Sequence, residues 1–235
     1  MKTLTLLAAV LVSGALGAQT PATAEKRVQL FGEYSRPKQF ILAQPNGDVR
    51  DQADTQLGVG LRFMVELPGT NDWFLEFGGK LDGSSRLGFK QNFLMPLPAV
   101  AVFINSTDVT VKYAYWEIGG AYVWDLGTGI TVGAHLDLRS ETLSAQGQIV
   151  VGPTPPYTGS GTVDQRGTMM RPWVRVSADF AFKSSGVAPF IGADVAYTPI
   201  HSSQNQVVPF AALDDRTLKA MATQFGASIY FGLKF

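Results

Sequence analysis

The chain has 235 residues, of which 16% are charged, 25 are glycine and none is cysteine. Basic and acidic side chains both number 19, so the chain offers no net positive field for binding nucleic acid. The lack of cysteine excludes a disulfide framework, a thiol nucleophile and a thiolate metal site. Ordinary soluble domains carry about 25% charged residues and about 7% glycine, so this composition is charge-poor and glycine-rich.

The N-terminal segment has the pattern of a secretory signal peptide. Lys2 gives it a basic start, an apolar run follows from Leu4 to Leu16, and small residues near positions 17 and 24 provide cleavage sites. The run is shorter than the about 20 apolar residues of a membrane-spanning helix. We therefore expect residues 1–24 to be a signal peptide and residues 25–235 to form the exported domain.

Beyond residue 24, apolar residues recur at every second position, which is typical of strands with two different faces. In Val109–Asp125 the apolar residues stand first at odd and then at even positions, which predicts a β-bulge near Tyr115–Glu117. The alternation predicts eight strands, in chain order Val28–Phe40, Leu57–Val65, Trp73–Leu81, Val109–Asp125, Ile130–Leu138, Val174–Phe182, Val187–Tyr197 and Phe225–Phe235.

The connections between these strands alternate in length. Three are short turns, at residues 67–71, 126–129 and 184–186. Four are long, at about Lys38–Ala53, Gly88–Ser106, Ala145–Gly167 and Pro199–Met221. Short turns at one end and long loops at the other are typical of membrane barrels, whereas compact soluble domains rarely hold so many long loops. The sequence therefore predicts an all-β, eight-stranded antiparallel up-and-down transmembrane β-barrel.

Aromatic residues lie near the ends of the predicted strands. We expect one ring beside the short turns, formed by Trp73, Trp124, Phe182 and Phe235. We expect a second ring at the opposite ends, formed by Tyr34, Tyr113, Tyr197 and Phe225. Such rings mark the two interfaces of a bilayer. They favour the membrane barrel over a soluble lipocalin-like barrel, whose apolar face points inward.

The last strand carries apolar residues at alternate positions and ends in an aromatic residue. The residues of this assembly signal are Ile229, Phe231, Leu233 and Phe235. In this signature and in its architecture the chain resembles the small eight-stranded outer-membrane barrels of the OmpA transmembrane domain and OmpX type, although Leu233 stands where many members have tyrosine. The resemblance implies a place in the bacterial outer membrane, in contact with its lipid, after insertion by the barrel-assembly machinery. We expect a monomer.

The interior of an eight-stranded barrel is just wide enough to be filled by side chains. Inward charges should pair there, because a buried charge without a partner is costly. The charges expected to form this lumen network are Glu33, Arg62, Glu76, Lys80, Glu117, Asp137, Arg139, Arg175 and Asp179. Such a network would act as a plug, and a narrow solute pathway is the alternative.

Catalytic and metal sites find little support in the sequence. Of two histidines, His135 faces inward with Asp137 on the same face, and His201 lies in a long loop. The deacylase family of outer-membrane barrels would instead place a serine two residues after the histidine and its nucleophile on the lipid-facing surface. His135 and Asp137 also lack a third metal ligand nearby. We expect no enzyme activity, no catalytic residue, no metal and no cofactor.

One predicted loop is unusually apolar, with no charged residue from Gln91 to Thr107 and two prolines that exclude a regular helix. Three interpretations remain open: residues 99–104 extend the fourth strand, the loop covers the barrel mouth, or it is a contact patch for a partner or lipid. The residues expected to form this interaction loop are Phe93, Leu94, Met95, Leu97 and Phe103.

These features favour a structural or surface-interaction protein whose lumen is filled by side chains. The first alternative is a passive conduit or binder for a small apolar molecule. The second is a lipid-modifying outer-membrane hydrolase. The sequence does not identify the surface partner.

Overall fold

The computed structural model describes residues 24–35, 40–42, 49–51, 56–70, 72–87, 90–96, 99–106, 109–152, 159–183, 186–200, 207–208 and 222–235. The expected signal peptide, apart from its last residue, lies outside this part of the chain. No helix among the described residues is long and apolar enough to cross a membrane. The strands are β1 (Lys26–Ser35), β2 (Phe40–Leu42), β3 (Val49–Asp51), β4 (Gln56–Glu66), β5 (Trp73–Leu87), β6 (Lys90–Pro96), β7 (Ala99–Ser106), β8 (Val109–Asp125), β9 (Ile130–Gly152), β10 (Gly159–Ala181), β11 (Ala188–Tyr197), β12 (Val207–Val208) and β13 (Phe225–Lys234).

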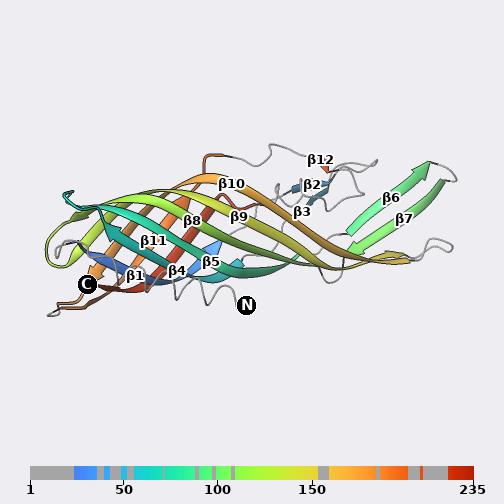
Figure 1. The fold of residues 1–235 in the computed structure, drawn as a ribbon. Coiled ribbons are helices and arrows are strands. Elements are labelled where there is room, and N and C mark those ends of the chain that lie inside the picture. Colours follow the sequence, from blue (N-terminus) through green and yellow to red (C-terminus); the bar gives the residue numbers. More distant parts are fainter. Residues whose placement is uncertain are drawn as a thin grey trace.

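Eight of these strands form a closed barrel (Figure 1). They follow the chain order β1, β4, β5, β8, β9, β10, β11 and β13, and each pairs antiparallel with the next. The pairing of β13 with β1 completes the cylinder, so no open edge remains around it. The predicted all-β, eight-stranded antiparallel up-and-down barrel is confirmed.

The two faces of each strand differ sharply in character. On β4 the side chain of Leu57 is 73% exposed, whereas that of Arg62 is fully buried. On β13 Ile229 is 74% exposed and its neighbour Tyr230 only 5%. The outer face of the barrel is therefore apolar and its interior polar, which is the reverse of a soluble barrel.

The hairpin of β9 and β10 is much longer than the sequence predicted. Its paired residues run from Ile130↔Phe180 to Val151↔Gly159, so the prediction of a long loop over Ala145–Gly167 is wrong for most of that range. Outward residues of β9 beyond Leu138 are Ser140, Thr142 and Ser144. Because the apolar-to-polar alternation stops at Leu138, the periodic signal ends there although the strand continues.

The bulge predicted near Tyr115–Glu117 is also misplaced. Along β8 the alternation is unbroken, with Val111, Tyr113, Tyr115 and Glu117 all buried inside the barrel. The irregularity lies on β5, where the register shifts between Lys80 and Gly83. Tyr113 consequently belongs to the lumen and not to the outer aromatic ring. Its ring packs against the Lys80 ammonium, which lies 4.4 Å from the ring centroid, and this contact gives an inward tyrosine a partner.

Beyond the barrel, β7 pairs with the same edge of β9 as β8 does. The pairing of β7 follows that of β8 along β9 and runs from Ser106↔Ile149 to Phe103↔Gly152. β6 pairs with β7, and Figure 1 shows this hairpin extending away from the barrel. A small separate sheet joins β12, β2 and β3. Residues 103–106 thus lengthen the sheet beside β9, next to the fourth predicted strand, and the rest of the described apolar segment pairs within the hairpin.

The register of this hairpin divides the residues of the expected interaction loop. Phe93 and Met95 lie on one face, whereas Leu94 shares the other face with Phe103, because Asn92 is the partner of Phe103. Leu97 lies outside the described residues. The register alone therefore assigns the four described members to two faces of the hairpin, and their role in contact stays a prediction.

Candidate functional site in the barrel lumen

The centre of the lumen is occupied by Arg62 of β4. Its Nε atom lies 2.8 Å from Glu117 Oε1 and 2.8 Å from Glu76 Oε1, and its Nη1 lies 3.0 Å from Asp194 Oδ2. Glu76 also pairs with Arg175, which reaches Asp137 Oδ2 at 3.3 Å. One arginine thus joins carboxylates from three strands, and a second extends the network to β9 and β10.

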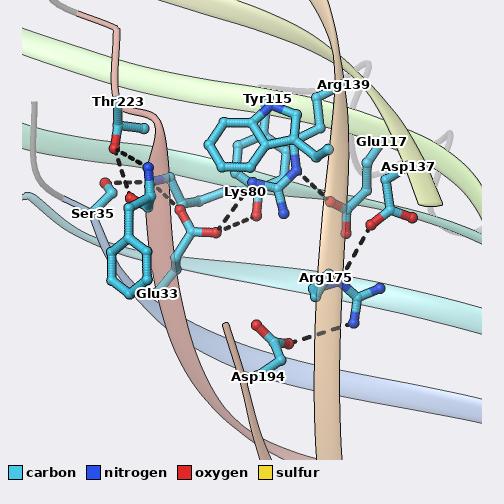
Figure 2. Close-up of polar contacts among 12 residues, drawn as sticks. Glu33, Ser35, Lys80, Tyr115, Glu117, Asp137, Arg139, Arg175, Asp194 and Thr223 are labelled. Atoms are coloured by element: carbon cyan, nitrogen blue, oxygen red, sulfur yellow. Dashed lines mark hydrogen bonds and ion pairs between the residues drawn. The ribbon is translucent and has the colours of Figure 1, made fainter. Parts of the chain in front are cut away.

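The network continues toward the long-loop end (Figure 2). Arg139 Nε lies 2.9 Å from Glu117 Oε2, and Arg139 Nη1 lies 3.7 Å from Glu33 Oε2. Glu33 accepts hydrogen bonds from Lys80 at 2.8 Å and from Tyr115 at 2.6 Å. Eight of the nine charges expected in the lumen therefore belong to one connected set of ion pairs.

Two further pairs lie at the ends of this network. Toward the short turns, Asp179 lies 3.5 Å from Arg27 and accepts a 2.6 Å hydrogen bond from Thr131. Toward the long loops, Glu141 accepts bonds from Arg171 and from the Trp173 indole. The charged and polar side chains therefore occupy the lumen over most of its length.

Arg27, Glu141, Arg171, Trp173 and Asp194 are lumen residues that the predicted set lacked. Glu141 lies two residues after Arg139, and Arg171 lies four residues before Arg175, so both share the parity of predicted members. Extending the two predicted strands by three residues each, to Glu141 and to Arg171, would have included both. For these two residues the predicted strands ended too early because the outward face had become polar, whereas Asp194 lies within the predicted strand Val187–Tyr197.

The buried charges are nearly balanced. The described residues include six buried basic side chains and seven buried acidic ones inside the barrel. The basic ones are Arg27, Arg62, Lys80, Arg139, Arg171 and Arg175, and the acidic ones are Glu33, Glu76, Glu117, Asp137, Glu141, Asp179 and Asp194. Because each ion would be costly alone, this balance is what allows so many charges to remain buried.

Glycines make room for these long side chains. A Cβ atom at Gly119 would lie 2.3 Å from Asp137 Oδ1, and one at Gly133 would lie 2.6 Å from both His135 Nε2 and Ser177 Oγ. Such distances are far inside van der Waals contact. The glycine content of the sequence therefore reflects, at these positions, the space that inward polar groups need.

His135 lies between a hydroxyl and a carboxylate. Its Nε2 is 2.8 Å from Ser177 Oγ, and its Nδ1 is 2.8 Å from Glu76 Oε2, the order of groups found in serine hydrolases. Arg175 Nη2 also lies 2.9 Å from Nδ1. Nδ1 thus faces a carboxylate, which only accepts, and a guanidinium, which only donates, so it can donate to Glu76 or accept from Arg175, and the role of Nε2 toward Ser177 changes with that choice.

This cluster is buried within the described part of the barrel. The side chains of His135, Ser177 and Glu76 are at most 6% exposed. No serine follows His135 by two residues, as the deacylase family would require, but Ser177 of the neighbouring strand lies beside it through the pairing Gly133↔Ser177. Among the described residues, no group of three or more His, Asp or Glu side chains is arranged to hold a metal ion.

The outer face carries the aromatic residues expected beside the short turns. Trp73, Trp124, Phe182 and Phe235 are between 43% and 50% exposed. At the other ends of the strands Tyr34, Tyr197 and Phe225 are also exposed, and Trp116 of β8, which the sequence did not single out, is 51% exposed.

The residues of the assembly signal all lie on this outer face. Ile229, Phe231, Leu233 and Phe235 are between 39% and 74% exposed. The backbone of Phe235 pairs with that of Lys26 through bonds of 2.9 and 3.0 Å. The last residue is therefore held against the first strand of the barrel.

No protein-family model and no curated protein matches the chain. Among solved structures, it is similar to the outer membrane protein OprG of Pseudomonas aeruginosa, at 10% identity, covering 90% of this chain and 96% of that one, with a TM-score of 0.48. It is also similar to Ail, the attachment invasion locus protein of Yersinia pestis, at 13% identity, covering 90% and 99%, with a TM-score of 0.42. Neisserial surface protein A matches at 8% identity, covering 89% and 95%, with a TM-score of 0.38.

At these identities the likeness concerns the fold alone. The architecture that the resemblance to small eight-stranded outer-membrane barrels implied is confirmed by strand number, chain order and closure in the structure itself.

Proposed function

We propose that this chain is a bacterial outer-membrane barrel with a sealed lumen and a structural or surface-interaction role, without catalysis. The observation that carries the proposal is the continuous ion-pair network from Lys80 through Arg62 to Arg175, whose side chains are nearly or fully buried. A lumen filled in this way supports the barrel wall and leaves function to the surfaces outside it.

The membrane location is supported by the height of the apolar outer face. On β8 the exposed residues Trp124 and Trp116 bound this face and lie eight residues apart. Eight strand residues span about 26 Å, or about 20 Å along the membrane normal at a tilt of about 40°. This is close to the apolar band of about 25 Å that outer-membrane barrels present to lipid. The contacts of such a barrel would be outer-membrane lipid and, during insertion, the barrel-assembly machinery.

The surface role is supported by the strands that continue past this band. β9 and β10 extend well beyond Leu138 and Val174, and β7 and β6 widen the same sheet. A membrane-spanning strand needs only about 9–11 residues, whereas β9 and β10 have 23 each. The additional length supports the proposal that a paired sheet extends outside the membrane, where a surface partner would contact it.

The test of the sealed lumen is the conductance of the refolded barrel in planar bilayers. We expect no single-channel steps from the wild-type protein. The double variant Arg62→Ser with Glu117→Ser removes one charge of each sign from the centre of the network, and we expect it to conduct. Protease protection in vesicles and heat-modifiable migration on gels establish that both proteins are inserted and folded.

Conductance by the wild-type protein would support the conduit and contradict the plug. The hydrolase alternative is tested by analysing lipid A from expressing cells. We expect unmodified lipid A both with the wild-type protein and with His135→Gln. Deacylated lipid A that disappears in His135→Gln or Ser177→Ala would overturn the non-catalytic role.

A further inference from the structure

Two cations lie in one row across three neighbouring strands of the outer face. Lys112 of β8 and Arg166 of β10 are both register partners of Ser144 on β9. Buried residues next to them in sequence, such as Val111 and Gly167, point inward. Because side chains alternate along a strand, Lys112, Ser144 and Arg166 point outward. Adjacent strands are about 4.8 Å apart, which separates the Cα atoms of the two cations by about 10 Å.

The row lies just beyond the apolar band. Trp116 of β8 and Met170 of β10 are both register partners of Ser140 on β9. They are 51% and 65% exposed and are the last large apolar residues of the outer face on their strands. Lys112 and Arg166 each lie four residues further along their strands. That offset is about 13 Å along a strand and about 10 Å in height. The headgroup layer is about 5–8 Å thick, and long basic side chains reach down into it.

Hydroxyl groups fill the interval between the cations and the band. Thr142 and Thr168 are register partners of each other on β9 and β10, and both are on the outward face. Hydroxyls and cations together are the groups that bind phosphate oxygens.

Among the residues whose side chains the structure describes, neither Lys112 nor Arg166 has an ion-pair partner. The nearest carboxylate in register, Asp164, lies one row further out and accepts a 3.2 Å hydrogen bond from Gln146.

We propose that Lys112 and Arg166, with the hydroxyls of Ser144, Thr142 and Thr168, bind the phosphate of a lipid headgroup in the leaflet on the long-loop side. The inference rests on the proposed membrane location. The site fixes the barrel's height and its orientation toward anionic lipid, with Trp116 anchored at the interface below it.

The experiment follows backbone amide resonances of the folded barrel in phosphatidylcholine nanodiscs. Phosphatidic acid with the same acyl chains is the probe, and it is added in steps. We expect saturable shifts at residues 112, 142, 144, 166 and 168. Lys112→Gln and Arg166→Gln should each weaken binding about five-fold, which corresponds to about 1 kcal/mol per cation at a membrane surface. Lys112→Arg should keep the affinity.

The matched control is Lys183→Gln, which removes an exposed cation beside the short turn at the other end of the barrel. We expect it to leave binding unchanged. Equal affinities in all three Gln variants would overturn the site. Inorganic phosphate that produces the same shifts with the same affinity would overturn the lipid as its source.

The two proposals fail in different ways. A barrel that does not insert into nanodiscs contradicts the membrane location itself. Insertion without localised shifts at the row removes only the lipid site.

Discussion

The inner and outer faces of the same eight strands are specified in different ways. In the proposed membrane location the outer face needs only apolar side chains of any shape, because lipid adapts to them, and Leu57, Ile118 and Ile229 are 73%, 57% and 74% exposed there. The inner face needs particular pairs, since Arg62 serves Glu117, Glu76 and Asp194 at once. Substitutions should therefore be tolerated outside and costly inside, and the following changes test that contrast.

The largest effect is expected at Arg62. Arg62→Leu keeps most of the side-chain volume but leaves Glu117, Glu76 and Asp194 without their shared cation. Removal of one partner from a buried ion pair destabilises by roughly 3–5 kcal/mol. Chemical denaturation of the barrel in detergent micelles, followed by tryptophan fluorescence, measures this loss.

The control for this prediction is Lys183→Gln, an exposed cation outside the lumen, for which we expect a change within about 0.5 kcal/mol. If Arg62→Leu and the double variant Arg62→Leu with Glu117→Leu are both neutral, water rather than protein would be screening the charges. The lumen would then be hydrated, and the contrast between the two faces would fail.

A smaller loss is expected when space in the lumen is filled. Gly133→Ala places a Cβ atom 2.6 Å from His135 Nε2 and Ser177 Oγ, so one of these side chains must move. Overpacking of a filled interior costs about 1–3 kcal/mol. The matched variant is Gly32→Ala on β1, where a Cβ atom meets nothing within 4 Å and little change is expected. Equal unfolding midpoints for the two variants would contradict a tightly filled lumen.

The difference between the faces also explains how far the sequence was informative. Alternation with a period of two located all eight barrel strands and placed the predicted charges inside, because the apolar outer face and the polar interior contrast strongly across the barrel wall. Above the band that contrast disappears. The sequence therefore gave no sign that β9 and β10 continue through Ser144 and Arg166, and the lumen members Glu141 and Arg171 were missed with them.

Residue type alone was a poor guide to whether a side chain lies in the lumen or on the outer face. Tyr113 looks like an interfacial aromatic residue, yet it packs on Lys80 in the lumen. Partners on different strands, such as His135 and Ser177, depend on register, which the sequence does not state.

A modest effect on stability is expected at the C-terminal residue. Deletion of Phe235 removes two backbone hydrogen bonds to Lys26, each worth about 0.5–1.5 kcal/mol. We expect a loss of about 1–2 kcal/mol in the refolded protein and less heat-modifiable barrel in cells. Phe235→Leu keeps the backbone bonds, so it should preserve the stability of the refolded protein while lowering assembly in cells. Unchanged surface levels in both variants would contradict an assembly role for the terminal aromatic residue.

The smallest effect on stability is expected in the β6–β7 hairpin, which extends away from the barrel. Replacement of Leu94, Leu97 and Phe103 by Ser removes apolar groups from the stretch between Gln91 and Thr107, which has no charged residue. Because β7 with β9 is the one strand pairing between the described hairpin residues and the barrel, the free energy of unfolding should change by less than about 0.5 kcal/mol. Cell-surface binding or autoaggregation should fall, since exposed apolar surfaces mark contact sites.

The register separates Leu94 and Phe103 from Phe93, so Phe93→Ser together with Met95→Ser tests the opposite face of the hairpin. A loss confined to one pair identifies the contacting face. Unfolding of the barrel in either variant would show that the hairpin is core, and unchanged aggregation in both would show that it makes no contact.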